Sequence, residues 1–559
     1  MASVRQLVLD VHSALSFKRG IAPLESTSYG RGWEAPTWVG AQHERRLAAY
    51  KVLYATFRNC GREFLGTDDE EAKAQHREYG DANLLVKVVL AAVLGDDISL
   101  VVADSDDKEN QAAVARQAWL EDWAETERLR AKIMETERDA QIYGDGVYVL
   151  TNNLAKRRTR VRLFDPGFYF PELDPNAAED EFPTRVHIAW EYEARTGPRQ
   201  SKSYIRRMTW ELAPLPDGQT RRYAWNGEAS SLTCYMTDAT WAVGDTEGYD
   251  VENFPMSRAT FALQDSPAGP VAVERLDLGI DFLPVVHMPN TVEIKAHFGE
   301  ALISAVAQIL DDLARADTDS VSAAELAGRP MVAATDMAGQ DFKVRAGTVL
   351  PLGPQGTIIP LDLSAGLKAC MEFVTSLRDR LNENSRVPAE VVGRMKANQD
   401  RSGIELALSW GPMRSLVEEM RLVRNEKYPV LLRFVQRMSM AAGWLEGDVL
   451  PAEVRFGSFL PTDKTAIVDL VIKLWDKKVI SRQTGLQLLV DEGVLNVDVA
   501  AELARAEADD VEMAAALRDA TEGDFDAVYE LLHRERPEES EPEPAIDPTI
   551  PLPPAPERQ

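Results

Sequence analysis

Residues 299–327 read GEALISAVAQILDDLARADTDSVSAAELA, and the pattern in this stretch guides the interpretation of the rest of the chain. Its apolar residues recur every three or four positions, which is the period of an amphipathic helix. They are Leu302, Val306, Ile309 and Leu313. Asp312 and Asp319, seven residues apart, lie on the opposite side. The stretch therefore predicts a helix with one packing face and one acidic face.

A second helix of similar length is predicted downstream, at 364–384 (SAGLKACMEFVTSLRDRLNEN). Between the two, residues 328–361 contain the turn-forming sequences GRP, LPLGP and QGT. Val344 and residues 349–352 are typical of short strands there. Two helices that flank a compact β-like insertion are expected.

A polar loop at 387–403 follows, and a long helix is expected after it. Ser402 and Glu405 fit the S-x-x-E capping box that opens such a helix. Gly411 and Pro412 predict a kink in it, because an interior proline removes a hydrogen bond and clashes with the preceding turn. The helix is expected to end near Met438. Further predictions are a strand at 453–459, a helix at 463–478 and acidic helices at 481–530.

The part of the chain before residue 299 changes its period near residue 143. Helices are predicted at 41–58, 84–94 and 110–143, with a short strand at 98–102. Alternating and aromatic segments then predict a β-rich block. Its strands are expected within 143–150, 156–164, 185–192, 203–212, 233–237 and 283–290. The fold class predicted is α+β with several domains.

Composition limits the functions that are open to this chain. Its 559 residues suffice for about three to four domains. The 90 acidic residues outnumber the 62 basic ones, so the net charge is −28. DNA is repelled overall, and any DNA contact has to be local. The three cysteines, Cys60, Cys234 and Cys370, predict neither a zinc site nor a disulfide framework. The apolar run at 84–94 is shorter than a membrane span, and the first 20 residues are not typical of a signal peptide.

Motifs for catalysis are missing from the sequence. No P-loop, H-E-x-x-H or G-x-S-x-G occurs, and we interpret Gly144, Asp145 and Gly146 as a tight turn before a strand. Acidic clusters at 68–71, 106–107 and 311–312 form solvated faces or, as the alternative, paired acids for metal or proton chemistry. The basic run at 156–162 either forms part of a solvated hairpin or, as the alternative, binds phosphate. We expect no catalytic residue, metal or cofactor.

The order of these elements resembles that of tailed-bacteriophage portal proteins, the head-to-tail connectors, in a siphophage-like form. FGEALISAVAQILDDLARADTDS (298–320) is similar to the first stem helix. SRVPAEVVGRMKANQDRSGIELAL (385–408) is similar to the tunnel loop and the start of the tunnel helix, and DKKVISRQTGLQLL (476–489) to the entry into the crown. The resemblance is best over 280–490 and extends upstream to residue 41.

The resemblance implies a portal-like fold with an α/β wing, a two-helix stem, a small β-containing clip, a long kinked tunnel helix and a helical crown. The implied segments are an N-terminal arm (1–40), the wing (41–298), stem helix 1 (299–327), the clip (328–361), stem helix 2 (362–384), the tunnel loop (385–401), the tunnel helix (402–440), a wing return (441–480), the crown (481–533) and a Pro/Glu-rich tail (534–559).

It also implies a non-enzymatic function. Portal proteins form dodecameric rings at one capsid vertex, through which double-stranded DNA passes non-specifically during packaging and ejection. The implied partners are further copies of the chain, the major capsid protein, a head–tail adaptor, the large terminase subunit and, as a further candidate, a scaffolding protein. No membrane partner is expected. The location would be the virion, with assembly in the host cytoplasm.

The candidate DNA-facing residues follow from the implied tunnel loop. They are Arg386, Arg394, Lys396, Asn398, Gln399 and Asp400. Arg394 and Lys396 either touch phosphates transiently or pair with Asp400 or with acids of a neighbouring subunit. Asp312 and Asp319 are the candidates for acidic residues in the lumen, together with helices at 491–530, where 13 acids and two arginines give −11. The alternatives are another virion structural protein, such as a capsid or baseplate component, or a Mg²⁺-dependent nuclease.

Overall fold

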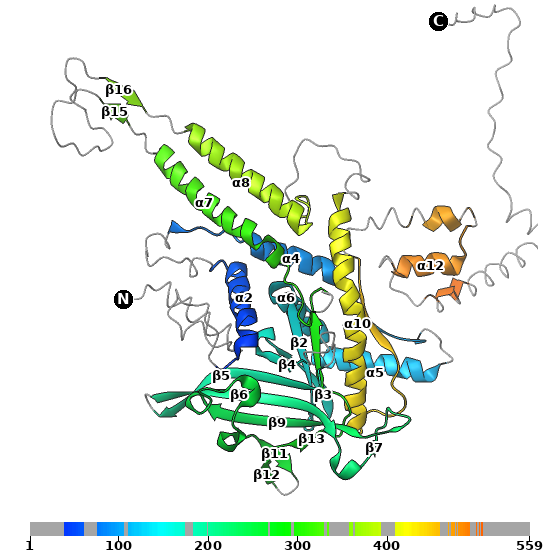
Figure 1. The fold of residues 1–559 in the computed structure, drawn as a ribbon. Helices are drawn as coiled ribbons and strands as arrows, with labels where there is room; N and C mark the ends of the chain where they lie inside the picture. Colours follow the sequence, from blue (N-terminus) through cyan, green and yellow to red (C-terminus); the bar gives the residue numbers. More distant parts are fainter. Residues whose placement is uncertain are drawn as a thin grey trace, which may run out of the picture. The chain divides into compact units, whose positions relative to one another are not determined.

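The computed structural model describes two compact units, which divide after residue 460. The described residues of the first unit are 38–60, 75–105, 110–173, 183–197, 200–266, 269–291, 296–328, 332–334, 357–360, 364–392 and 409–458. Those of the second are 468, 471–475, 477, 479–491, 499, 502–503 and 505–506. The first unit contains both helices and strands, with β2 to β14 following one another between α6 and α7 (Figure 1), so the predicted mixture of α and β structure is confirmed.

Most predicted helices are confirmed. The helices of the first unit are α2 (Ala41–Phe57), α4 (Asp81–Leu94), α5 (Gln111–Glu127), α6 (Leu129–Tyr143), α7 (Ala307–Gly328), α8 (Ser364–Ser385) and α10 (Gly411–Ala441). The second unit contains α12 (Arg482–Asp491), within the stretch predicted to be helical. Short 3₁₀ turns are η2 (Pro166–Phe168), η3 (Pro216–Gly218), η4 (Val243–Asp245), η5 (Val251–Asn253), η6 (Met256–Arg258) and η7 (Ser304–Val306). No helix among the described residues has both the length and the apolar composition needed to cross a bilayer.

The strands pair antiparallel throughout the described sheets. The largest sheet has the order β10-β9-β6-β5-β4, with β13 also paired to β9, and a three-stranded sheet has the order β14-β2-β3. Their bounds are β2 (Asp145–Asn153), β3 (Arg158–Phe164), β4 (Tyr169–Glu172), β5 (Arg185–Gly197), β6 (Gln200–Pro214), β9 (Leu232–Ala242), β10 (Thr260–Phe261), β13 (Leu276–Asp277) and β14 (Val285–Pro289). Two-stranded pairs are formed by β1 (Ile98–Val102) with β17 (Ala452–Phe456), β7 (Arg221–Arg222) with β8 (Ala229–Ser230), β11 (Leu263–Ser266) with β12 (Gly269–Ala272), and β15 (Val332–Ala334) with β16 (Ile358–Pro360).

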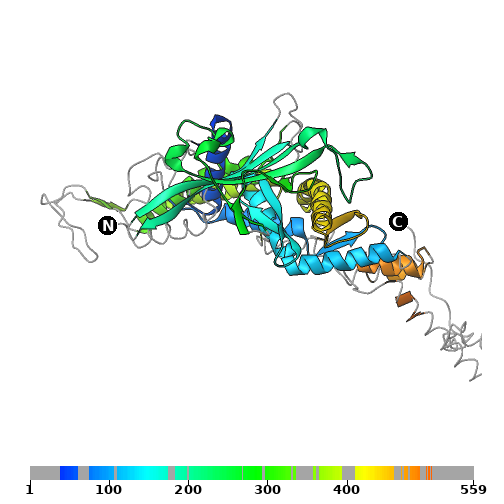
Figure 2. The same cartoon turned by 90° about the horizontal axis from the view of Figure 1, so that it is seen from below.

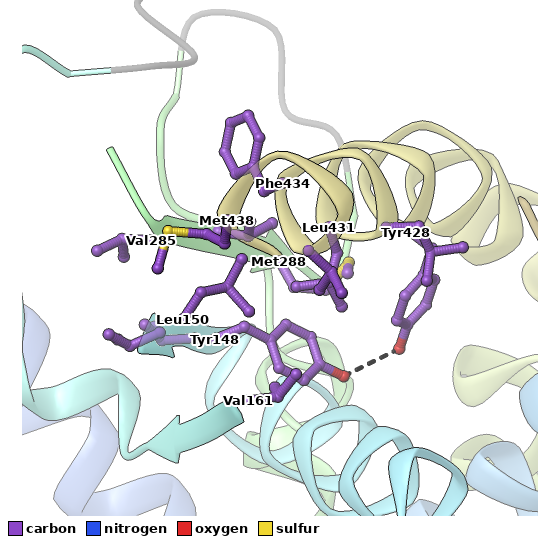
Figure 3. Close-up of a cluster of buried hydrophobic side chains, with 14 of the residues drawn as sticks. Tyr148, Leu150, Val161, Val285, Met288, Tyr428, Leu431, Phe434 and Met438 are labelled. Atoms are coloured by element: carbon purple, nitrogen blue, oxygen red, sulfur yellow. Dashed lines mark hydrogen bonds between the residues drawn. The ribbon is translucent and has the colours of Figure 1, made fainter. Parts of the chain in front are cut away.

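One hydrophobic core lies between the three-stranded sheet and α10. The alternation of the strands turns Tyr148, Leu150 and Val161 to one face of the sheet, and α10 covers that face with Tyr428, Leu431 and Met438 (Figure 3). Burial of such side chains is the main stabilising term in folding. In Figure 2, where α10 is seen nearly along its axis, the strands of the large sheet lie on one side of α10 and α5 lies on the other.

Helix α5 closes the free edges of two sheets through its polar side chains. Gln117 accepts a hydrogen bond from the Val102 N–H (2.7 Å) and donates one to the Leu100 carbonyl oxygen (2.7 Å) on the outer edge of β1. The Trp123 indole N–H donates to the Thr159 carbonyl oxygen on the outer edge of β3 (2.8 Å). Unpaired strand edges invite pairing with other chains, and α5 prevents this at two places.

Two helix boundaries differ from the prediction. The stretch 110–143 forms two helices, because Arg128 adopts a left-handed conformation (φ 53°) between α5 and α6. The helix predicted at 299–327 begins only at Ala307, after η7. The backbone before it is engaged elsewhere: the Gly299 N–H donates to the Asp145 carboxylate, and the Leu302 N–H donates to the Gln141 carbonyl oxygen. These tertiary hydrogen bonds replace those of a helix.

Whether the predicted helix kinks at Gly411 and Pro412 stays a prediction: Ser409 is helical and Trp410 is a turn residue, but residues 401–408 lie outside the described ones. Helix α10 begins at Gly411, so Pro412 lies in its first turn, where the missing N–H has no helical partner to lose. The proline inside the helix is Pro429. Residues 401–408, and with them the capping box of Ser402 and Glu405, lie outside the described residues, as do the predicted strands at Val344 and 349–352.

Candidate functional site at a helical hairpin

Helices α7 and α8 form a hairpin whose far end is the strand pair β15–β16 (Figure 1). Because β15 follows α7 and β16 precedes α8, the two 22-residue helices run in opposite directions. Their facing sides belong to one buried cluster, which includes Leu310, Leu313, Ala316, Val374, Leu377 and Leu381. Arg378 and the buried Asp317 form an ion pair between the helices (3.3 Å). The apolar seam and this ion pair hold the two helices in register.

The side of α7 away from this seam is acidic. The helix carries five acidic residues, of which Asp317 lies in the seam, and one arginine, Arg315, which pairs with Asp311 (2.6 Å). Asp319 is exposed and Asp312 is half-buried. Neither carboxylate has an ion-pair partner in the parts of the chain described above. The two candidate lumen residues therefore have solvent-accessible carboxylates, and whether they face a lumen stays a prediction.

A buried carboxylate fixes the base of the hairpin. Asp145, at the start of β2, accepts hydrogen bonds from the Gly299 N–H (2.9 Å), from His287 Nε2 (2.8 Å) and from the Tyr50 hydroxyl. Burial first, and then the Asp145 charge, raise the pKa of Tyr50 well above its ordinary value. Three elements, α2, β14 and the segment that leads into α7, are thereby joined to β2.

Two glycines allow this close approach. Gly144 has a left-handed φ of 95°, and a Cβ atom there would collide with the carbonyl oxygen of Gly299. A Cβ atom at Gly299 would collide in turn with the carbonyl oxygen of Gly144. The turn expected before a strand is found at Gly144, and the strand begins already at Asp145. No pattern in the sequence predicts that Asp145 reaches residue 299.

Three aromatic rings stack beside Asp145. The His287 and His297 rings are 4.6 Å apart between centroids, and Tyr169 stacks on both. The Tyr169 hydroxyl and His297 Nε2 are 2.9 Å apart. Asp145 and His287 are hydrogen-bonded as in a catalytic dyad, but their hydrogen-bond partners among the described residues are tyrosine, histidine and backbone groups, with no serine or cysteine. We assign the cluster a positioning role.

Helix α10 is anchored to the body of the unit by a buried ion pair. Arg424 lies against Glu137 of α6, with an Nη2–Oε2 distance of 2.7 Å. Arg424 Nη2 also donates to Asn290 Oδ1 (2.9 Å), and the Tyr428 hydroxyl donates to Glu137 Oε1 (2.7 Å). Buried charges of this kind are tolerated only when they are paired and hydrogen-bonded. No sequence motif predicts this contact.

Only one of the six tunnel-loop candidates falls within the described residues. Arg386, directly after α8, is half-exposed, has a left-handed φ of 58° and forms an ion pair with Glu419 of α10 (3.0 Å). This contact joins the end of α8 to α10. Arg394, Lys396, Asn398, Gln399 and Asp400 lie outside the described residues.

In the described part of the chain, no group of three or more His, Cys, Asp or Glu side chains is placed so that it could hold a metal ion. Asp311 and Asp312 are at least partly open to solvent on α7, and the acidic clusters at 68–71 and 106–107 lie largely or wholly outside the described residues. The three cysteines are free. Burial raises the pKa of the Cys234 thiol to about 12, so this thiol is not activated.

Comparisons with known proteins give little further information. No protein-family model matches this chain, and no curated protein matches it. A solved structure described as "Neck of native GTA particle computed with C12 symmetry" is similar with a TM-score of 0.36 and 12% sequence identity, over 87% of this chain and 99% of that chain. At this TM-score a common fold is not shown.

Proposed function

We propose that this chain is a portal protein of a tailed bacteriophage. Copies would close into a ring, a dodecamer by resemblance, at one capsid vertex, and double-stranded DNA would pass through it during packaging and ejection. The observation that supports the proposal most is the hairpin of α7 and α8, closed by β15–β16 and followed by the 31-residue helix α10. The segments that resemble the stem, clip and tunnel helix contain these elements in the same order.

The charge of the chain suits a conduit. Each phosphate contact adds affinity for DNA, and a passage that gripped the duplex would slow it. Asp312 and Asp319 of α7 have no ion-pair partner among the described residues and are at least partly exposed, so twelve copies would present many negative charges to a central duplex. Asp312 and Asp319 would keep it away from the wall.

Exposed apolar side chains near the hairpin suit ring closure. Met371 and Phe373 of α8 are 60% and 55% exposed, and Leu422 of α10 is 64% exposed. A ring of identical copies uses two different surfaces of each copy, one for each neighbour. Such interfaces would bury apolar groups that one chain leaves in water.

The proposed partners follow from the same function. The ring would contact the major capsid protein, a head–tail adaptor, the large terminase subunit and a scaffolding protein, in the virion and during assembly in the host cytoplasm. We further propose that it needs no cofactor and catalyses no reaction, because energy for DNA movement would come from the terminase.

Native mass spectrometry and negative-stain imaging of the purified chain test the proposal. We expect an annular particle near twelve copies, and a clean monomer at micromolar concentration would contradict it. The variant Phe373→Glu should weaken assembly while the chain stays folded. Its matched control is Leu263→Glu, at an equally exposed leucine of β11 (67% exposed), which should leave assembly unchanged.

A further inference from the structure

One face of the large sheet combines aromatic rings with cations. Strand pairing places Trp190 opposite Arg206, and Tyr192 opposite Tyr204. Lys202 lies two residues before Tyr204 on β6, and side chains two residues apart share a face of a strand. The next residues, Glu191 and Glu193, alternate to the other face. The strand pattern therefore places Glu191 and Glu193 on the opposite face, whereas Asp238 of β9 shares the face of the cations and pairs with Arg206.

The cations lie over aromatic rings, which hold them in place. The Arg206 guanidinium is 5.5 Å from the Trp190 ring centroid, and Lys202 Nζ is 5.7 Å from that of Tyr204. On β3, the Arg162 guanidinium is 5.1 Å from the Phe164 centroid. Phe164 and Trp190 are themselves 5.9 Å apart, so Arg162 of β3 joins the same surface as Arg206 of β6.

Two of the arginines of this face lack a carboxylate partner among the described residues, although the chain as a whole is strongly acidic. Arg206 is paired with Asp238 through two hydrogen bonds (2.9 and 2.6 Å). Arg160 and Arg162, both exposed, have no carboxylate partner in the described parts of the chain. Burial lowers the pKa of Arg162, and the nearby charges of Arg206 and Arg160 lower it further. Arg162 therefore lies near two further guanidinium groups, those of Arg160 and Arg206, and near one carboxylate, that of Asp238.

We infer that this cationic–aromatic face, made of Arg160, Arg162, Trp190, Tyr192, Lys202, Tyr204 and Arg206, binds the phosphate backbone of nucleic acid. Guanidinium groups match the geometry of phosphate oxygens, and the positive face attracts a polyanion that the rest of the chain repels. Tyr192 stacks on Tyr204 (5.9 Å between ring centroids) and is 38% exposed, so part of this ring pair is open to an unpaired base. An acidic peptide would use the cations alone, so the aromatic rings favour nucleic acid. The inference does not depend on ring formation.

Fluorescence anisotropy with a labelled oligonucleotide, single-stranded or duplex, tests it over a series of salt concentrations. The double variant Arg160→Gln and Arg162→Gln of the full chain should bind roughly tenfold more weakly, and the slope of log affinity against log salt should fall by about 1.4 to 1.8, as expected for two lost phosphate contacts. The control is Lys87→Gln with Lys368→Gln, two exposed lysines on α4 and α8, which removes the same charge elsewhere.

The two double variants must differ. Equal affinities for them, or an absence of binding by the unaltered chain at low salt, would overturn the inference. So would binding of poly-glutamate that depends on Arg160 and Arg162 without any such dependence for oligonucleotides. Tyr192→Ala should weaken binding of the single strand more than of the duplex. Thermal unfolding and particle size are measured on the same samples, so a failed ring, which would count against the portal proposal, is distinguished from a failed nucleic-acid site.

Discussion

Arg424 of α10 and Glu137 of α6 form an ion pair in which neither side chain is exposed to solvent. Arg424 Nε and Nη2 both donate to Glu137 Oε2, at 2.9 and 2.7 Å. Asn290, at the end of β14, accepts from the same guanidinium through its side chain. One charged group thus joins the long helix to both the helical layer and the three-stranded sheet.

Replacement of one partner should destabilise the protein more than replacement of both. Arg424→Met leaves the Glu137 carboxylate buried without its cation, which costs about 3–5 kcal/mol. The double variant Arg424→Met with Glu137→Leu removes both charges and should recover much of this loss. Chemical denaturation of the three proteins measures the difference, and a double variant no more stable than the single one would contradict the assigned pairing.

Gln117→Leu should lower the free energy of unfolding, because it leaves the outer edge of β1 without its side-chain hydrogen bonds. The variant removes the side chain that bonds to the Val102 N–H and to the Leu100 carbonyl oxygen. An unsatisfied buried backbone group costs about 1–3 kcal/mol, so we expect a loss of that order in the free energy of unfolding. Gln111→Leu, at the exposed start of the same helix, is the control and should change stability little.

Periodicity was sufficient to predict the elements but not the contacts between them. The bounds of β1 agree with the predicted strand at 98–102, and α8 agrees within one residue with the predicted helix at 364–384. In these segments the spacing of the apolar residues matches the period of the element that forms. The start of α7 was predicted wrongly because Gly299 and Leu302 bond to Asp145 and Gln141, which are about 150 residues away in sequence.

For the candidate site, too, the local pattern could be predicted and the contacts between elements could not. The acidic face of α7 can be predicted from the spacing of Asp312 and Asp319. The anchoring of α10 through Arg424 and Glu137 cannot, since nothing local separates this arginine from those that remain on the surface. The role of Pro412 cannot be read from the sequence for a related reason: a proline signals either the start or the interior of a helix, and only the course of the preceding residues decides between them.

Buried histidines should make stability depend on pH. Burial lowers the pKa of His43 and of His187 below the ordinary value of 6.5, although Glu252 and Glu172 act in the opposite direction. Below about pH 6.5 the unfolded chain binds protons that the folded chain excludes, so stability is fully present above that pH and is lost as the pH falls. We expect the thermal midpoint to decrease between about pH 7 and pH 5. The double variant His43→Gln with His187→Gln should show a shallower decrease, and an equal slope would contradict this source.

Reversal of the acidic charges on α7 tests the proposed lumen. Asp312→Lys with Asp319→Lys changes the charge by four units per copy on the face that would surround DNA. Rings of this variant should bind duplex DNA roughly tenfold or more tightly, with a steeper dependence on salt, because each new phosphate contact releases counterions. In an assay for DNA movement through the particle, the same contacts should slow the duplex.

The control for this experiment makes the same change of charge elsewhere. Asp217→Lys with Glu228→Lys alters two exposed acids near β7 and β8, at a distance in sequence from the hairpin. If both variants bind DNA equally, the effect comes from net charge alone and the acidic face of α7 does not line the passage. If the α7 variant fails to form rings while the control forms them, these carboxylates lie at a contact between copies. Tight, salt-sensitive binding by the α7 variant alone is the result that the proposed conduit requires, because only charges that surround the duplex act on it from every copy at once.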